Sequence, residues 1–256
     1  GEISVAGTRK ANVLKVKTEN KLSEFYVQLA GGFNANNDWY GQIQKGDFDS
    51  LRTRLVQKQN ASVIYHTNNS ELFIGAHCWM SQQSQLCFDQ PIRTSKTKGN
   101  VSFVTQNVDL SDFSAFMPDG LTITGKVNGY AKASWAQGQK PKIDVKLLTK
   151  NGIIGITGDD PQEIGSNLKY DQISVIAKSI SEGLQLRLDV KTPAIGTGYA
   201  NVVIDPYSAN KAMRGEVAFN ELQLKVLKPF IADVRRLDGS LSFAGKVNGS
   251  LSRPLV

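Results

Sequence analysis

The side chains best suited to covalent chemistry are the two cysteines, Cys78 and Cys87, which lie in the segment HCWMSQQSQLCFDQP. Eight residues separate them, and the polar residues between them favour a turn, so the two thiols can face each other across a hairpin. In an oxidising compartment they would form a disulfide, which contributes roughly 2–3 kcal/mol for so small a loop. We therefore expect a disulfide, with free thiols as an alternative.

Zinc is a second alternative for the cysteines because His66 and His77 are near them in the sequence. The spacing of these four residues matches no standard zinc site. Successive side chains of a strand also point to opposite faces, so His77 would point away from Cys78. The sequence therefore favours the disulfide over a metal site.

Catalytic motifs are absent from the sequence: it has no Gly-Xaa-Ser-Xaa-Gly elbow, no phosphate loop and no His-Glu-Xaa-Xaa-His. The carboxylate pair Asp159-Asp160 precedes Pro161 and is typical of a turn. The segment GIIGITG, residues 152–158, lacks the strand–loop–helix context of a dinucleotide site, and its glycines suit strand bends. We expect no enzyme and no cofactor.

The formal net charge of +7 invites a nucleic-acid or anionic-lipid interpretation. The basic residues, however, are dispersed singly along the polar phase of the expected strands. There is no tight basic run and no RNA-binding signature with interleaved aromatics. We therefore expect a solvated basic face and no nucleic-acid partner.

Apolar and polar residues alternate along much of the chain. In LSFAGKVNGSL, residues 241–251, Leu241, Phe243 and Val247 share one phase, and LTITGKVNGYAKASW, residues 121–135, follows the same rule. Because side chains alternate faces along a strand, each row gives one apolar and one hydrated face. Continuous apolar runs are nearly absent, which favours an antiparallel sheet over a doubly covered parallel one.

Turn and helix signals are few. Asn151-Gly152 lies between two alternating rows and predicts a type I′ hairpin. Helical spacing is confined to DLSDFSAFMP, residues 109–118, and LQLKVLKPFIAD, residues 222–233, where Pro229 limits the helix. We expect an all-β protein with one or two short amphipathic helical turns.

The motif GKVNG occurs twice, at Gly125–Gly129 and Gly245–Gly249, and an Asp-Gly pair and an alternating row precede each copy. Such tandem β-units predict an elongated, curled antiparallel sheet, a trough whose modules pack on their neighbours. We expect one continuous sheet with two segments, residues 1–158 and 159–256. Both ends of the sequence are typical of the middle of a strand, so we expect an internal fragment of a longer chain.

The cysteine segment resembles the Cys-Trp…Leu-Cys hairpin of the TamB family, the inner-membrane subunits of the bacterial translocation and assembly module. The resemblance continues through NVDLSDFSAFMPDGLTITGKVNGYAKASW and FNELQLKVLKPFIADVRRLDGSLSFAGKVNGSLSRPLV. It covers residues 74–135 and 215–256 specifically, and residues 1–60 and 151–210 only as a pattern. The cysteine element is its specific part, because alternating β repeats also suit the wider AsmA-like proteins.

The resemblance implies a location and partners. Members of the family are anchored in the inner membrane by an N-terminal helix and extend across the periplasm to TamA, an outer-membrane barrel. Their long sheet curls into a taco-like trough with an apolar interior. They are linked to outer-membrane protein assembly and to phospholipid movement between the membranes. We therefore expect a periplasmic segment, with phospholipid, TamA and nascent outer-membrane proteins as partners, and a phospholipid or detergent as the bound molecule.

Three interpretations of the apolar phase follow. A lipid conduit would use it to hold acyl chains out of water, at about 0.8 kcal/mol per CH₂. A scaffold for outer-membrane proteins would instead offer a sheet edge to their strands. In a plain sandwich the same residues would fill a closed core. Glycine and alanine within the phase (Gly125, Gly129, Ala131 and Ala133) favour the conduit, because a tight core would use bulky residues throughout.

The residues predicted to line the groove belong to the apolar phase of the alternating rows. They are Leu121, Ile123, Val127, Ala131, Ala133, Ile143, Val145, Leu147, Leu184, Leu186, Leu188, Val190, Val202, Ile204, Val217, Phe219, Leu241, Phe243, Val247 and Leu251. The helical turns are predicted to plug or close the trough locally. Their apolar residues are Leu110, Phe113, Phe116, Leu227 and Phe230.

Overall fold

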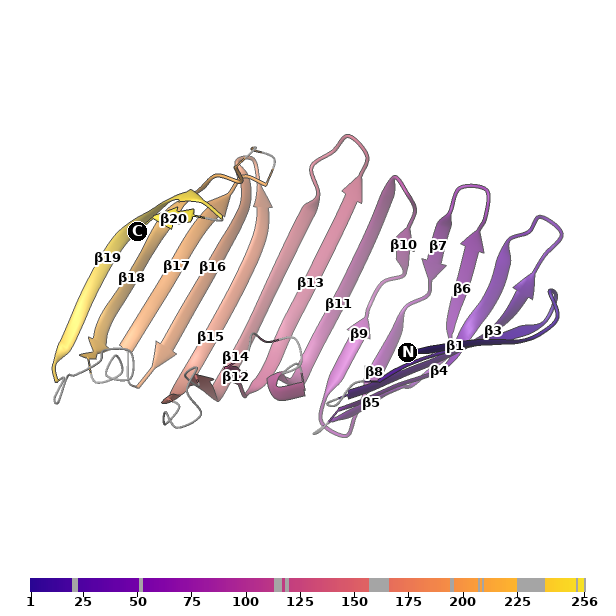
Figure 1. Ribbon diagram of the computed structural model, residues 1–256, viewed down its shortest axis with the longest axis horizontal. Coiled ribbons are helices and arrows are strands. Elements are labelled where there is room, and N and C mark those ends of the chain that lie inside the picture. Colours follow the sequence, from indigo (N-terminus) through magenta and orange to yellow (C-terminus); the bar gives the residue numbers. More distant parts are fainter. Residues whose placement is uncertain are drawn as a thin grey trace. The chain divides into compact units, whose positions relative to one another are not determined.

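The chain folds as an antiparallel β protein. The computed structural model describes residues 1–19, 23–50, 53–112, 117, 120–156, 166–193, 196–206, 208, 210–224, 238–251 and 253–255. Within these residues helical geometry is confined to a 3₁₀ turn at Leu110–Asp112 and to Leu224, and the remaining regular structure is β (Figure 1). The prediction of an all-β antiparallel fold with little helix is confirmed.

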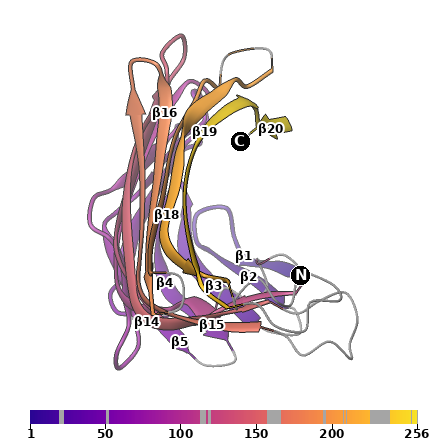
Figure 2. The ribbon, with the colours of Figure 1, turned by 90° about the vertical axis from the view of Figure 1, so that its left-hand side faces the viewer.

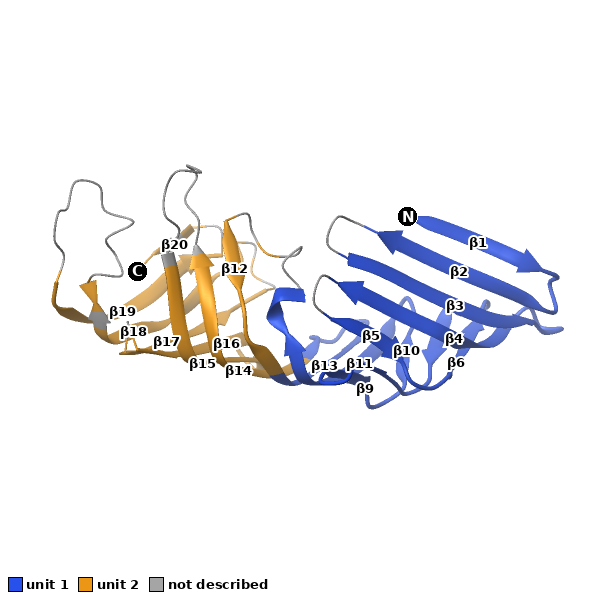
Figure 3. Cartoon of the chain, turned by 90° about the horizontal axis from the view of Figure 1, so that it is seen from below, with its two compact units in different colours: residues 1–115, 128–142 blue, residues 116–127, 143–256 orange. Residues whose placement is uncertain are grey.

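Two compact units divide the chain. Unit 1 contains residues 1–115 and 128–142, and unit 2 contains residues 116–127 and 143–256 (Figure 3). The predicted division at residues 158 and 159 concerns the sequence repeats along the chain, and it stays a prediction.

Unit 1 begins with four strands joined as successive hairpins, each paired with the next. They are β1 (Glu2–Gly7), β2 (Asn12–Glu19), β3 (Ser23–Phe33) and β4 (Trp39–Ser50). The next three strand positions in the sheet are each occupied by two short strands. They are β5 (Arg54–Gln57) with β6 (Ala61–His66), β7 (Glu71–Ile74) with β8 (His77–Met80), and β9 (Gln85–Phe88) with β10 (Ile92–Thr94). β4 pairs with both β5 and β6.

Two longer strands follow in unit 1. β11 (Lys98–Asp109) pairs with both β9 and β10, and β13 (Lys126–Ala136), most of which lies in unit 1, pairs with β11. The meander therefore runs through the unit without a crossover, and alternation along each strand decides which residues share a face.

Unit 2 is a second antiparallel meander, in which each strand pairs with the next one named. Its strands are β12 (Leu121–Ile123), β14 (Lys142–Ile156), β15 (Ser166–Ile180), β16 (Gly183–Thr192), β17 (Gly196–Ile204), β18 (Met213–Gln223), β19 (Ser240–Ser250) and β20 (Arg253–Leu255). β18 and β19 bend along their length, as the side view shows (Figure 2).

The predicted hairpin at Asn151-Gly152 is wrong, because β14 continues through both residues. Lys150 pairs with Gln172 and Gly152 pairs with Tyr170, so both sides of the dipeptide stay on β15. A type I′ turn needs positive φ at both central residues. Here Asn151 has a φ of 55°, whereas Gly152 is not among the residues with positive φ, and the strand changes direction locally without reversing.

The two GKVNG copies share three structural features. Gly120 and Gly239, which precede the copies, have positive φ angles of 78° and 105°, and the last glycines, Gly129 and Gly249, have 150° and 98°. The valine of each copy is also buried. The copies differ at their first glycine, because Gly125 separates β12 from β13 whereas its counterpart lies within β19.

Candidate functional site

The predicted groove residues of β16 to β19 form rows on one face of unit 2. Directly opposed residues of an antiparallel pair point to the same face. One row joins Leu186, Val202, Gly215 and Val247 across four strands. A neighbouring row joins Leu188, Ala200, Val217 and Gly245, and the next joins Val190, Gly198, Phe219 and Phe243. Side chains far apart in the sequence therefore make one apolar surface, which we call the apolar face of unit 2.

β14 and β15 extend this apolar face. Leu147 pairs with Val175, which pairs with Leu188, and Val145 reaches Leu186 through Ala177 in the same way. Ile143 precedes Val145 by two residues and shares its phase. Leu121 and Ile123, also predicted to line the groove, lie on β12, which pairs with the end of β14 at Ile154–Ile156.

The pairing of β18 with β19 contains a β-bulge next to the row of Phe219 and Phe243. The register shifts between Phe219 and Leu222, where Glu221 has a φ of 62°. Leu241 pairs with Leu222 and so stays on the side of Phe243. A β-bulge inserts one residue without turning the rest of the strand over, which keeps the predicted phase intact.

The opposite face of unit 2 is polar. Arg187 and Asp189 of β16 form an ion pair of 2.8 Å on that face. The hydrogen bonds that Arg187 donates to Asp189 raise the pKa of the Arg187 guanidinium, which also lies 5.8 Å from the centre of the Tyr199 ring. Gln185 lies on the same face, and its side-chain amide donates to the side-chain oxygen Oδ1 of Asn201. The sheet therefore has one hydrated face and one apolar face.

Much of the apolar face is accessible to solvent. Leu188 is 40% exposed, Phe243 is 42% exposed and Leu241 is 46% exposed. Large apolar side chains in the middle of a β-sandwich are buried by the facing sheet. No described segment of unit 2 covers these three side chains in that way.

The remaining predicted residues are distributed differently. Val127 and Val247 are buried, whereas Leu251 follows β19 in a turn and is 53% exposed. Ala131 and Ala133 belong to β13 within unit 1. Of the predicted plug residues, Leu110 lies half-buried in the 3₁₀ turn. Phe113, Phe116, Leu227 and Phe230 lie outside the described residues, as do Asp159 and Asp160.

Gly125 and Gly198 do not leave their space empty, which corrects the sequence argument at these two positions. A Cβ on Gly198 would lie 2.5 Å from the Phe219 ring, and one on Gly125 would lie 2.2 Å from the Tyr170 hydroxyl. Aromatic side chains of neighbouring strands therefore occupy these spaces. The openness of the face comes from uncovered side chains, not from missing ones.

Sequence reasoning missed a second apolar surface, in unit 1. Ile43, Ala61 and Val63 are buried there, each under 9% exposed, and Val27, Leu29, Trp39, Leu72 and Ile74 pack against them. The alternation of Phe25, Val27 and Leu29 was the available signal. It marks a strand but does not reveal which strands lie beside it.

The predicted disulfide is present in the structure. Cys78 and Cys87 are directly opposed on β8 and β9, and their sulfurs are bonded. The adjacent pair, His77 and Phe88, stacks with ring centres 4.8 Å apart, and His77 Nδ1 lies 2.8 Å from the Gly75 carbonyl oxygen. No group of three or more potential metal ligands occurs in the described part of the chain.

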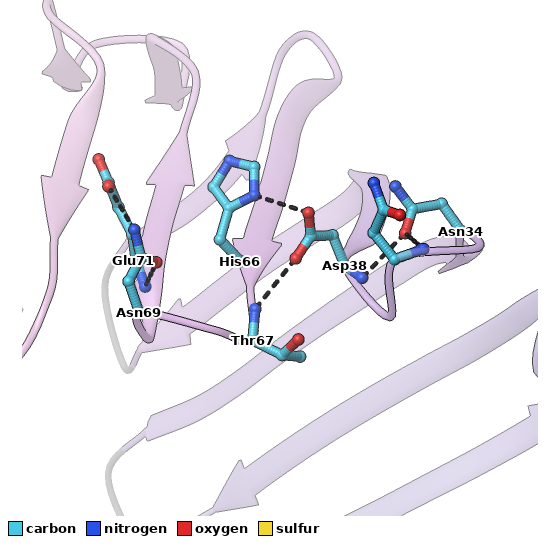
Figure 4. A network of polar contacts seen from close by, with 7 residues as sticks. Asn34, Asp38, His66, Thr67, Asn69 and Glu71 are labelled. Carbon is cyan, nitrogen blue, oxygen red and sulfur yellow. Dashed lines mark hydrogen bonds and ion pairs between the residues drawn. The ribbon is translucent and has the colours of Figure 1, made fainter.

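His66 takes part in a separate polar network between two turns of unit 1 (Figure 4). Its Nδ1 lies 2.9 Å from Oδ2 of Asp38, while Oδ1 of Asp38 accepts the Thr67 backbone N–H at 3.1 Å. The hydrogen bond from His66, and secondarily that from Thr67, lowers the pKa of the Asp38 carboxyl. The network ties the β3–β4 turn to the end of β6, which is a structural role.

The fold and its faces define a class of protein: an antiparallel sheet with one polar face and one apolar face, the latter open in unit 2. The chain belongs to the TamB family, because the family described as "TamB, N-terminal domain" matches residues 1–256. In the described part of the chain, no helix has the length and apolar character that crossing a membrane requires.

A curated relative supports the family. The chain is 19% identical over 256 residues to the "Translocation and assembly module subunit TamB" of Haemophilus influenzae. The alignment covers 100% of this chain and 19% of that relative, so the chain spans about a fifth of the relative's length. No solved structure matches the chain.

Proposed function

We propose that this chain is part of a periplasmic conduit that carries phospholipid between the inner and outer membranes, without catalysis. The observation that carries the proposal is the solvent-accessible apolar face of unit 2, whose rows run across β14 to β19. An acyl chain lying on this face is removed from water, which is favourable by about 0.8 kcal/mol of transfer free energy per buried CH₂. Headgroups, in contrast, stay hydrated at the margin of the sheet.

The character of the face suits lipid more than a small polar ligand. Its rows present leucine, valine and phenylalanine, whereas the charged residues Arg187 and Asp189 lie on the opposite face of the sheet. A specific polar ligand needs a few placed hydrogen-bonding groups, whereas an acyl chain needs only apolar area. Such a face can hold many acyl chains and release them, as transport requires.

A photocrosslinker tests the proposal at two adjacent positions of β19. Phe243 lies on the apolar face and Ser242 on the opposite one, so the two positions share a strand and differ in the face they occupy. We expect phospholipid to be captured at position 243 and not at position 242, as judged by mass spectrometry of the crosslinked protein. Equal capture at both positions, or at neither, contradicts the conduit.

A scaffold for outer-membrane protein assembly is the second proposal, and the name of the relative, a translocation and assembly module subunit, favours it. Such a scaffold would add strands of its client proteins to a strand of the sheet through backbone hydrogen bonds. Ile3 of β1 has an exposed side chain at which a reporter can be placed. A crosslinker at Ile3 tests this, because capture of outer-membrane proteins there supports it and capture of lipid alone does not.

The name of the relative supports a partner within the translocation and assembly module. We propose that the partner is the outer-membrane barrel TamA and that the compartment is the periplasm. A periplasmic location suits the disulfide between Cys78 and Cys87, because that compartment is oxidising. Co-purification of TamA with the full-length protein tests the partnership.

A further inference from the structure

An aromatic pair bridges two non-adjacent strands of unit 1. The rings of Phe25 and Trp79 stack with centres 5.8 Å apart and planes inclined by 19°. Phe25 belongs to β3 and Trp79 to β8, and β4 and β5 lie between these strands. Three strand spacings amount to about 14 Å in a flat sheet, so both rings must extend over the intervening strands to meet.

The residues beneath the pair are covered. A Cβ on Gly46 of β4 would lie 2.4 Å from the Trp79 indole, so the indole lies directly on the backbone of that strand. Leu55 of β5 is 4% exposed, and Trp79 itself is 8% exposed. Phe25 itself is 36% exposed, so its ring forms the outer surface of this layer, while Trp79 and Leu55 beneath it are covered.

Unit 2 differs in what lies over its central strands. Val175 and Leu188 lie on adjacent strands of its apolar face and are 37% and 40% exposed, about as much as Phe25, but no aromatic pair among the described residues lies over them. Both units alternate apolar and polar residues, so strand pattern does not explain the difference. The difference is that in unit 1 large aromatic side chains lie over neighbouring strands.

We propose that Phe25 and Trp79 exclude acyl chains from the β3–β8 part of unit 1, so that lipid lies on the apolar face of unit 2 and not beneath or between these rings. The inference rests on the proposed lipid-binding function and adds a determinant of where lipid is held. Phe25 acts here by covering Trp79, and removing its ring exposes the indole and the strands below.

Fluorescence quenching by phospholipid with brominated acyl chains measures this exclusion directly, because bromine quenches an indole only near contact. The experiment uses the 256-residue chain with Trp39→Phe and Trp135→Phe, which leaves Trp79 as its one tryptophan. We expect brominated lipid to leave Trp79 emission close to its value with unbrominated lipid. Adding Phe25→Ala should increase the quenching several-fold.

Two matched variants complete the design. Phe33→Ala removes a phenylalanine from the same strand but at the far end of β3, where it pairs with position 39, and should leave Trp79 unquenched. Phe25→Leu retains apolar volume without a ring, and should give intermediate quenching if Phe25→Ala does not fold. A separate reporter, Leu188→Trp with all three native tryptophans replaced by phenylalanine, should be quenched strongly.

The outcomes separate the two proposals. Strong quenching at position 188 together with equally strong quenching of Trp79 in the presence of Phe25 overturns the exclusion and leaves the conduit standing. An increase from Phe33→Ala as large as that from Phe25→Ala also overturns it. No quenching at position 188 overturns the proposed function and, with it, this inference.

Discussion

Tyr170 and Thr149 are joined by a hydrogen bond of 2.9 Å between their hydroxyl groups inside unit 2. The Tyr170 hydroxyl also lies 2.5 Å from the Thr124 carbonyl oxygen, to which it donates, so the Thr149 hydroxyl is the donor in the first bond. Tyr170 is 2% exposed, and it occupies the space that side chains on Gly125 and Gly152 would need. One tyrosine therefore ties β15 to β14 and to the segment that precedes β13.

Removing the Tyr170 hydroxyl should destabilise the chain. Tyr170→Phe leaves the half-buried Thr124 carbonyl and the buried Thr149 hydroxyl without this partner, and we expect a loss of roughly 1–3 kcal/mol in the free energy of unfolding. Urea unfolding measures it. Tyr199→Phe, on the polar face, is the control and should change stability by less than about 0.5 kcal/mol. Equal effects of the two variants would contradict the role of Tyr170.

The Cys78–Cys87 disulfide should form in exported protein. Intact mass after alkylation without reductant should show no modified cysteine, and both cysteines should be alkylated after reduction. Replacing both cysteines with serine should lower the free energy of unfolding by roughly 2–3 kcal/mol, because the cross-link restricts the unfolded chain. Two thiols that react without reductant would show that the pair is free in the cell.

The Asp38–His66 network should stabilise the chain in a pH-dependent way. The pKa of Asp38 is lowered in the folded state, so its contribution is present above the unfolded pKa of about 3.9 and is lost as pH falls through the lower folded value. The stability difference between the natural chain and Asp38→Asn should therefore shrink between about pH 5 and about pH 2. A difference that stays constant over this range in urea titrations would refute the linkage.

A carboxylate on the apolar face should impair lipid binding without unfolding the chain. Phe243 is 42% exposed, so the aspartate of Phe243→Asp retains access to water and avoids most of the cost of burial. We expect bound phospholipid, measured by denaturing mass spectrometry, to fall while the circular dichroism spectrum is unchanged. Ser242→Asp, on the opposite face, should retain its lipid. Full lipid retention by Phe243→Asp would count against the conduit.

The sequence by itself determined the strands, their faces and the cysteine pairing. Period-two alternation states which residues share a side of a strand, and antiparallel pairing joins those sides, so Leu188, Val217 and Phe243 lie on one face of the sheet. The Cys78–Cys87 pair followed from its short spacing. These features depend on a few neighbouring residues, which is why local patterns were sufficient.

Only the tertiary structure decided which apolar surface is open and which is filled. Phe25 and Trp79 lie on different strands with two others between them, and no local pattern states that their rings meet. Asn151-Gly152 shows the same limit, because turn chemistry does not reveal whether the flanking residues pair with each other or with a third strand. Exposure and strand partnership depend on residues distant in the chain, and those are brought together by packing.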